Sequence, residues 1–135
     1  MTKLSESNIQ NMILDYLNQK GIFSFRVNTT GTYDSQRGVY RSLGKFQLKG
    51  TSDIIGCLPD GKMLAIEVKS ETGRLSPEQK AFIDKIKKQG GIAFVAKNLQ
   101  DVERELQDYK IFCNISSSKQ TKDEENENPN RHEKI

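Results

Sequence analysis

The chain has 135 residues and a formal net charge of +3, with 21 Lys or Arg residues against 18 Asp or Glu residues. This length suffices for one domain with one core. No apolar run approaches the roughly 20 residues of a membrane span, so we expect no membrane partner. The mildly basic charge permits DNA as a partner. The only histidine, His132, lies in a polar tail, so mechanisms that need a core histidine as base or metal ligand are excluded.

The two cysteines, Cys57 and Cys113, show neither zinc-site nor disulfide spacing. The first residues also lack the apolar core of a signal peptide. We therefore expect reduced thiols in a cytoplasmic protein.

The first elements in chain order are a helix and a strand. Ser5 is a good N-cap, and apolar residues then recur at helical spacing up to Leu17, which predicts a helix that ends before Gly21. Residues 22–28 alternate between two faces, as a strand does. Between residues 29 and 50 the periodicity is lost in a sequence rich in Gly, Ser and Thr, and we expect a long loop.

The expected loop has a composition that suits either of two roles. Cations interleaved with aromatic residues favour a phosphate backbone and unstacked bases, but they are equally typical of a solvated surface. The cations of this loop are Arg37, Arg41, Lys45 and Lys49.

Residues 53–58 and 63–70 flank the turn sequence Pro59-Asp60-Gly61 and predict an antiparallel hairpin. Counting back from this turn places Asp53 opposite Glu67, unless the turn carries a bulge.

The remaining elements are a helix, a strand and a last helix. Ser76-Pro77-Glu78-Gln79 combines an N-cap serine, a proline at the first helical position and a capping-box glutamine, and Gly90-Gly91 ends the helix. Residues 92–96 read as a buried strand, and Asn98 caps the last helix. This order predicts an α/β fold with a mixed sheet covered by helices. We expect one domain over residues 1–115 and a polar, disordered tail over 116–135.

Glu67 and Lys69 lie two residues apart in a strand and therefore project from the same face. Alone, this pattern is also that of a solvent-facing ion pair. With Asp53 opposite, two carboxylates share the site and need a compensating positive charge, for which Mg²⁺ is a suitable ion. The ammonium of Lys69 would then orient a water molecule beside a phosphate.

The pattern of these residues resembles that of the PD-(D/E)XK nuclease superfamily. In particular, it resembles a small stand-alone domain of the virus-type replication-repair nuclease (VRR-Nuc) family, as found in phages. The stretch Gly50-Thr51-Ser52-Asp53 matches the family pattern G-x-x-D, and Glu67-Val68-Lys69 matches E-x-K. The segment GRLSPEQ, which ends at Gln79, is also similar to the family. The resemblance covers roughly residues 5–96.

The resemblance implies a restriction-endonuclease-like α-β-β-β-α-β core and a Mg²⁺- or Mn²⁺-dependent DNA endonuclease. It further implies a homodimer that cuts branched DNA or four-way junctions. The implied metal ligands are Asp53, Glu67, the backbone carbonyl of Val68, and Glu6 directly or through water. The other implied roles are Lys69 for the attacking water, Gln79 as its support, and Arg74 beside the loop cations as a phosphate contact.

Other interpretations of these residues remain open from the sequence. Glu6 is also an ordinary acid of a first helical turn, and Gln79 also caps its helix. A non-catalytic DNA-binding or assembly module with the same fold is the alternative function. It would bind DNA through the loop cations and would require neither Glu67 nor magnesium.

Overall fold

The computed structural model of the protein describes residues 3–27, 33–40 and 48–107. The chain divides into two units, Met1–Arg104 and Glu105–Ile135, and the elements below that position the site belong to the first. Among the described residues, no helix has the length and apolar character needed to cross a membrane. The tail expected over residues 116–135 lies outside the described residues.

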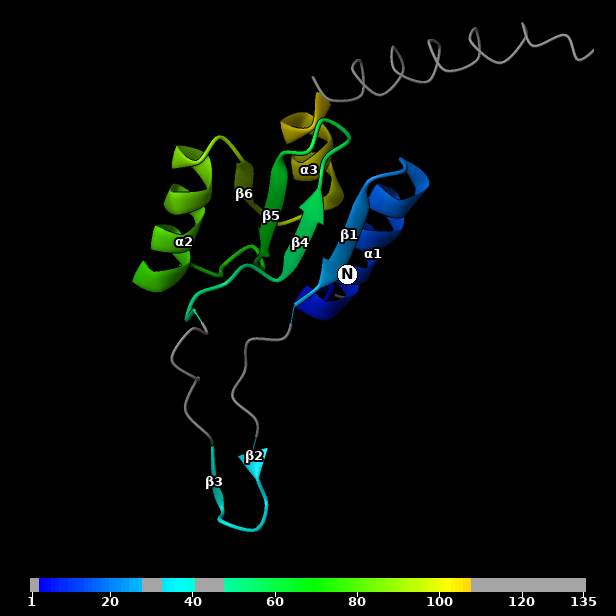
Figure 1. The fold of residues 1–135 in the computed structure, drawn as a ribbon. Coiled ribbons are helices and arrows are strands. Elements are labelled where there is room, and N and C mark those ends of the chain that lie inside the picture. The colour runs from blue at the N-terminus through cyan, green and yellow to red at the C-terminus, as the bar shows by residue number, and fades with distance from the viewer. Residues whose placement is uncertain (1–2, 28–32, 41–47, 108–135) are drawn as a thin grey trace, which may run out of the picture. The chain divides into compact units, whose positions relative to one another are not determined.

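A four-stranded mixed sheet forms the centre of the fold (Figure 1). Its strands lie in the order β1 (Phe23–Arg26), β4 (Ile54–Cys57), β5 (Met63–Val68) and β6 (Ile92–Ala96). The first two neighbouring pairs are antiparallel, whereas β5 and β6 run parallel. The expected α/β fold with a mixed sheet is confirmed.

The two longer helices cover opposite sides of this sheet (Figure 1). Helix α1 (Glu6–Gln19) begins at Ser5, whose side chain accepts a hydrogen bond from the Asn8 N–H, and it buries Ile13 and Leu17 completely. Helix α2 (Pro77–Lys88) packs on the other side. A short helix, α3 (Leu99–Glu105), follows the last strand.

Helix α2 begins with both bonds of the predicted capping box. The Gln79 N–H donates to Ser76 Oγ over 3.2 Å, and the Ser76 N–H donates to Gln79 Oε1 over 2.9 Å. Phe82 and Ile83 of the helix pack against Ala65 and other small apolar side chains of the sheet. Because these local signals were in the sequence, the helix lies where it was predicted.

The predicted register of the β4–β5 hairpin is confirmed. Ile54 lies opposite Ile66, and the Leu58 N–H donates to the Lys62 carbonyl over 2.8 Å at the turn. Continuing the ladder one residue beyond Ile54 brings Asp53 opposite Glu67.

Strand β5 is buried on both faces, which rules out a solvent-facing pair at Glu67 and Lys69. Leu64, Ile66 and Val68 are completely buried on one face, and Glu67 on the other face is only 2% exposed. The reason is that α2 covers the second face from Ala65 onward, so only Met63 at the start of the strand is exposed.

The long loop expected between residues 29 and 50 contains regular structure that the sequence did not reveal. Two short strands, β2 (Tyr33–Asp34) and β3 (Val39–Tyr40), pair in an antiparallel hairpin. The turn between them ends at Gly38, which has a φ of 64°. Strands of two residues are too short to show a period of two, so alternation could not predict them.

Candidate functional site

Asp53 is fixed where three strands meet at one end of the sheet. Its carboxylate oxygen Oδ2 accepts a hydrogen bond of 2.8 Å from the Val68 N–H, directly after Glu67. Its backbone carbonyl accepts a bond of 2.8 Å from the Val27 N–H, which follows β1. Asp53 is therefore held by backbone N–H groups on both sides, through its carboxylate on the β5 side and its backbone carbonyl on the β1 side, and it is half-buried.

The Glu67 carboxylate lies on the face covered by α2 and is held by two side chains. Its Oε1 accepts a hydrogen bond of 2.9 Å from Gln79 Nε2 and lies 3.6 Å from Lys69 Nζ. The other oxygen, Oε2, is buried and has no hydrogen-bond partner within the described part of the chain. Burial, and then the negative charge of Asp53, raise the pKa of Glu67 to about 7, although Lys69 acts in the opposite direction.

The Gln79 side chain caps its helix, as the sequence predicted, and its other end contacts Glu67. Its oxygen accepts from the Ser76 N–H and caps α2, while its nitrogen donates to Glu67. The same amide therefore joins the start of α2 to the acid on β5.

The Lys69 side chain is largely buried, and its stem packs against the connector that follows β5. The side chain is 16% exposed, and a Cβ at Gly73 would lie 3.3 Å from Lys69 Cβ and Cδ. A glycine at this position thus lets the connector lie close against the lysine. The packed stem restricts the ammonium to the neighbourhood of Glu67.

The backbone at Gly50, the first residue of the G-x-x-D pattern, requires a glycine. Its φ of 86° is unfavourable for other residues, and a Cβ there would clash with the backbone carbonyl of Glu78. Only glycine allows the chain to pass this close to the first turn of α2. The close approach brings the segment that ends at Asp53 next to the helix that carries Gln79.

Glu6 lies apart from the carboxylate pair in this structure. It is exposed in the first turn of α1, and its Oε1 accepts a hydrogen bond of 3.1 Å from the Ser70 N–H. Ser70 follows Lys69 directly, so this bond ties α1 to the end of the strand that carries the site. Over residues 3–27, 33–40 and 48–107, no three Asp, Glu, His or Cys side chains form a group suited to a metal ion.

The expected phosphate contacts are dispersed. Lys49 Nζ lies 3.6 Å from Glu78 Oε1, whereas Arg37 is exposed in the β2–β3 turn and Arg74 is exposed on the connector before α2. Arg41 and Lys45 lie outside the described residues.

Lys49 forms an ion pair with Glu78, in the first turn of α2. Hydrogen bonding to the helix backbone, and then the Lys49 ammonium, lower the pKa of Glu78. A phosphate at Lys49 would therefore compete with the Glu78 carboxylate for the ammonium.

Two lysines that the sequence analysis did not single out line a hollow beside the site. The hollow has a volume of about 430 Å³ and includes Lys3, Lys97 and Ser70. Because its walls come from three separate segments, no local sequence signal could have indicated it.

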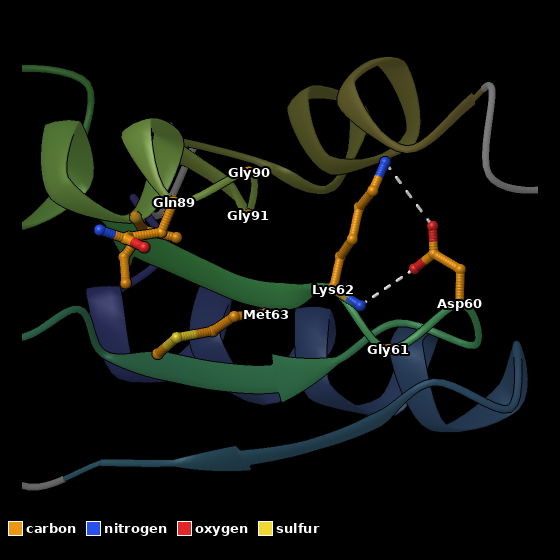
Figure 2. Close-up of a pocket in the computed structure, with 8 residues that line it drawn as sticks. Asp60, Gly61, Lys62, Met63, Gln89, Gly90 and Gly91 are labelled. Atoms are coloured by element: carbon orange, nitrogen blue, oxygen red, sulfur yellow. Dashed lines mark hydrogen bonds and ion pairs between the residues drawn. The ribbon is translucent and has the colours of Figure 1, made fainter.

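A second hollow, of about 310 Å³, lies at the turn end of the hairpin (Figure 2). Figure 2 shows Lys62 bound to Asp60 at its edge, through the backbone N–H at 3.1 Å and the ammonium at 3.7 Å. Met63, at the start of β5, also lines it, whereas Glu67 lies near the other end of that strand. The second hollow therefore lies apart from the carboxylate pair.

The residues present fit a divalent cation. Two carboxylates share one end of the hairpin. Glu67 Oε2 is buried and has no hydrogen-bond partner in the described structure, because the Gln79 amide and the Lys69 ammonium both contact the other oxygen, Oε1. A buried, unpartnered carboxylate oxygen is costly unless a cation neutralises it. Magnesium takes oxygen ligands and keeps several waters, so two carboxylates and a backbone carbonyl suffice.

Comparison with known proteins agrees with this geometry. The mixed sheet with Asp53 and the Glu67-Val68-Lys69 triplet defines a nuclease-like α/β domain, and the family model of the VRR-NUC domain matches residues 4–100. The chain belongs to the VRR-NUC domain family. This membership indicates a nuclease-type, DNA-processing domain of the PD-(D/E)XK kind, a group that generally uses divalent metal ions.

Two solved structures share the fold. One, described as "VRR_NUC domain", has a TM-score of 0.53 and 20% sequence identity, and the alignment covers 76% of this chain and 94% of that one. The other, described as "VRR_NUC domain protein", has a TM-score of 0.54 and 20% identity over 80% and 89% of the two chains. The search of curated proteins gives no match.

Proposed function

We propose that this chain is a Mg²⁺- or Mn²⁺-dependent endonuclease that hydrolyses phosphodiester bonds of DNA. The observation that carries the proposal is the buried Glu67 carboxylate, which lies between the Gln79 amide and the Lys69 ammonium. Burying such a group has no benefit for folding, because desolvation of a carboxylate is unfavourable. The arrangement instead suits a site that is organised before the substrate binds.

Asp53, Glu67 and the Val68 carbonyl would hold the cation, with Glu6 contributing through water. The cation would supply fixed positive charge to the phosphate and make a nearby water more acidic. Lys69 orients that water for attack on phosphorus and donates to a phosphate oxygen as negative charge builds there. The water oxygen forms a new P–O bond and releases a proton to solvent, while the P–O bond to the leaving oxygen breaks and that oxygen takes up a proton. Gln79 keeps Glu67 oriented throughout.

Two finer features belong to the same proposal: the enzyme acts on branched DNA, including four-way junctions, and it acts as a homodimer. A two-fold dimer presents two active sites to a two-fold junction. The exposed phenylalanines of β1 support the dimer, since Phe23 is 70% and Phe25 47% exposed. For phosphate contacts we retain Arg37, Arg41, Lys45, Lys49 and Arg74.

The test is cleavage of a labelled four-way junction and a matched linear duplex with Mg²⁺, Mn²⁺ or chelator. We expect metal-dependent paired nicks in the junction and a loss of roughly 100-fold or more in Lys69→Ala. Lys88→Ala, which changes an exposed lysine in the last turn of α2, is the matched control and should cut normally. Cutting that survives Lys69→Ala would contradict the mechanism. Binding without any cutting would favour the non-catalytic module.

A further inference from the structure

The hollow that contains Lys97 and the carboxylate pair lie at the same end of β5, on different sides of the strand. Its walls come from the residues at the start of α1, the connector after β5 and the residues after β6. The side chains that line it are Lys3, Leu4, Ile9, Ser70, Glu71 and Lys97, with Thr72 and Asn98. Ser70 follows Lys69 directly in the chain, so the hollow begins one residue beyond the site.

Lys97 lines this hollow as an exposed residue whose ammonium makes one hydrogen bond to the backbone. Its Nζ donates a hydrogen bond of 3.0 Å to the Glu71 carbonyl, and its backbone N–H donates to Asp101 Oδ2 over 2.9 Å. An ammonium has three donors, and the Glu71 carbonyl uses one. The remaining donors can contact an anion while the bond to the Glu71 carbonyl is kept.

The residues that line the hollow carry a small excess of positive charge, although two acids beside the lining, Glu6 and Asp101, accept hydrogen bonds from the Ser70 and Lys97 N–H groups. Lys3 and Lys97 contribute two positive charges and Glu71 one negative charge, so the lining carries a formal charge of +1. The N-terminal end of α1, with its positive dipole end, follows Lys3 and Leu4. The hydroxyls of Ser70 and Thr72 add groups that can donate to an oxyanion.

We propose that this hollow binds a phosphate group of the DNA strand, next to the phosphate that is cut. The inference rests on the proposed nuclease function and extends it by naming where the strand lies. Lys97 and Lys3 contact the phosphate oxygens, while Leu4, which is 55% exposed, contacts the neighbouring sugar. The strand thus crosses the carboxyl end of β5, from Lys69 on the α2 side to the hollow on the α1 side.

The test separates the charge of Lys97 from its structural hydrogen bond. Lys97→Gln keeps a donor for the Glu71 carbonyl but removes the charge, Lys97→Arg keeps the charge, and Lys88→Ala changes an exposed lysine elsewhere. Binding of fluorescent single-stranded and junction DNA is measured in chelator over a series of salt concentrations, and cleavage kinetics are measured with Mg²⁺. Lys3→Ala is treated in the same way.

For Lys97→Gln we expect binding to weaken roughly three- to tenfold and the slope of log affinity against log salt to fall by about 0.7–0.9, the value for one phosphate contact. KM should rise while kcat changes little, and Lys97→Arg should restore most of the affinity. An unchanged salt slope in Lys97→Gln and Lys3→Ala would overturn the proposal. So would an equal loss in Lys88→Ala.

Substrates with a 5′-phosphate or a 5′-hydroxyl distinguish the two sources of the phosphate. An effect of Lys97→Gln on both substrates assigns the hollow to an internal phosphodiester, and an effect only on the phosphorylated one assigns it to a strand end. Either outcome supports a phosphate site. If the salt slope depends on Lys97 but the wild type does not cut DNA, the nuclease proposal alone is contradicted. If the wild type cuts normally but the salt slope does not depend on Lys97, this inference alone is contradicted.

Discussion

At the scale of single residues, the Glu67 carboxyl shows a conflict between stability and chemistry. It is 2% exposed, one of its oxygens is unpartnered in the described structure, and its pKa is raised to about 7. In the folded protein the proton is therefore held more tightly than in the unfolded chain. Metal-free protein carries an unfavourable buried charge at neutral and alkaline pH, which a bound cation would compensate.

The raised pKa of Glu67 predicts the pH dependence of stability without metal. Between pH 4.5 and about 7 the folded state binds the proton and the unfolded state releases it, so stability falls as pH rises. A shift of this size corresponds to roughly 3 kcal/mol at most. Urea unfolding in chelator should show this decline in the wild type and a weaker one in Glu67→Gln. Equal pH slopes for the two proteins would contradict the prediction.

Mg²⁺ should stabilise the folded protein through the same carboxylates. At 100 times its dissociation constant, a cation that binds only the folded state adds about 2.7 kcal/mol. We expect Mg²⁺ to raise the melting temperature of the wild type at pH 8 and to have little effect on Asp53→Asn or Glu67→Gln. The measurement needs no DNA, so it tests the metal site separately from cleavage. A similar rise in all three proteins would indicate binding elsewhere.

At the scale of elements, the start of α2 joins a helix cap to the site. Ser76 and Gln79 exchange the two capping-box bonds, and the same Gln79 amide donates to Glu67. The close approach of Gly50 keeps this turn next to the Asp53 segment. The position of the helix start therefore determines the orientation of the acid on β5.

Two substitutions in this turn should separate capping from catalysis. Ser76→Ala removes one capping bond and should cost about 1 kcal/mol of stability while cleavage stays within a few fold of the wild type. Gln79→Ala also removes the bond to Glu67 and should lower kcat much more, at a stability cost of about 1–3 kcal/mol. Chemical denaturation and cleavage kinetics measure the two effects. Similar kcat values in the two variants would show that the Gln79–Glu67 bond is unimportant for catalysis.

At the scale of the whole molecule, one part of the sheet lacks a covering layer in the described structure. The uncovered apolar sheet face consists of Phe23 and Phe25 of β1, Cys57 of β4 and Met63 of β5, all of them exposed. Phe23 lies opposite Cys57, and Cys57 lies opposite Met63, so the side chains share one face. The face carries no formal charge, so two copies of it can meet across a two-fold axis without like-charge repulsion.

This face predicts how the proposed dimer can be broken. Phe23→Ser and Phe25→Ser should shift the protein from dimer to monomer in sedimentation experiments while the circular dichroism spectrum is unchanged. Leu48→Ser, at an exposed apolar residue that lies in no strand, is the control and should stay dimeric. A wild type that sediments as a monomer at micromolar concentration would contradict the homodimer itself. A dimer that survives both phenylalanine substitutions would place the interface elsewhere.

The sequence by itself determined the features that depend on neighbours along the chain. The N-cap of α1, the capping box of α2 and the hairpin register that pairs Asp53 with Glu67 were all predicted. Each follows from turn chemistry or from the period of two in a strand, which act over a few residues. The E-x-K triplet was visible for the same reason.

Only the tertiary structure decided which of these residues meet and how deeply they are buried. Gln79 reaches Glu67 because α2 folds back over β5, and Glu6 reaches the Ser70 N–H across 64 positions of sequence. The hollow at Lys97 likewise exists only where the start of α1 meets the ends of β5 and β6. Such contacts depend on how separate elements pack, and the spacing of residues along one strand or helix carries no record of that packing.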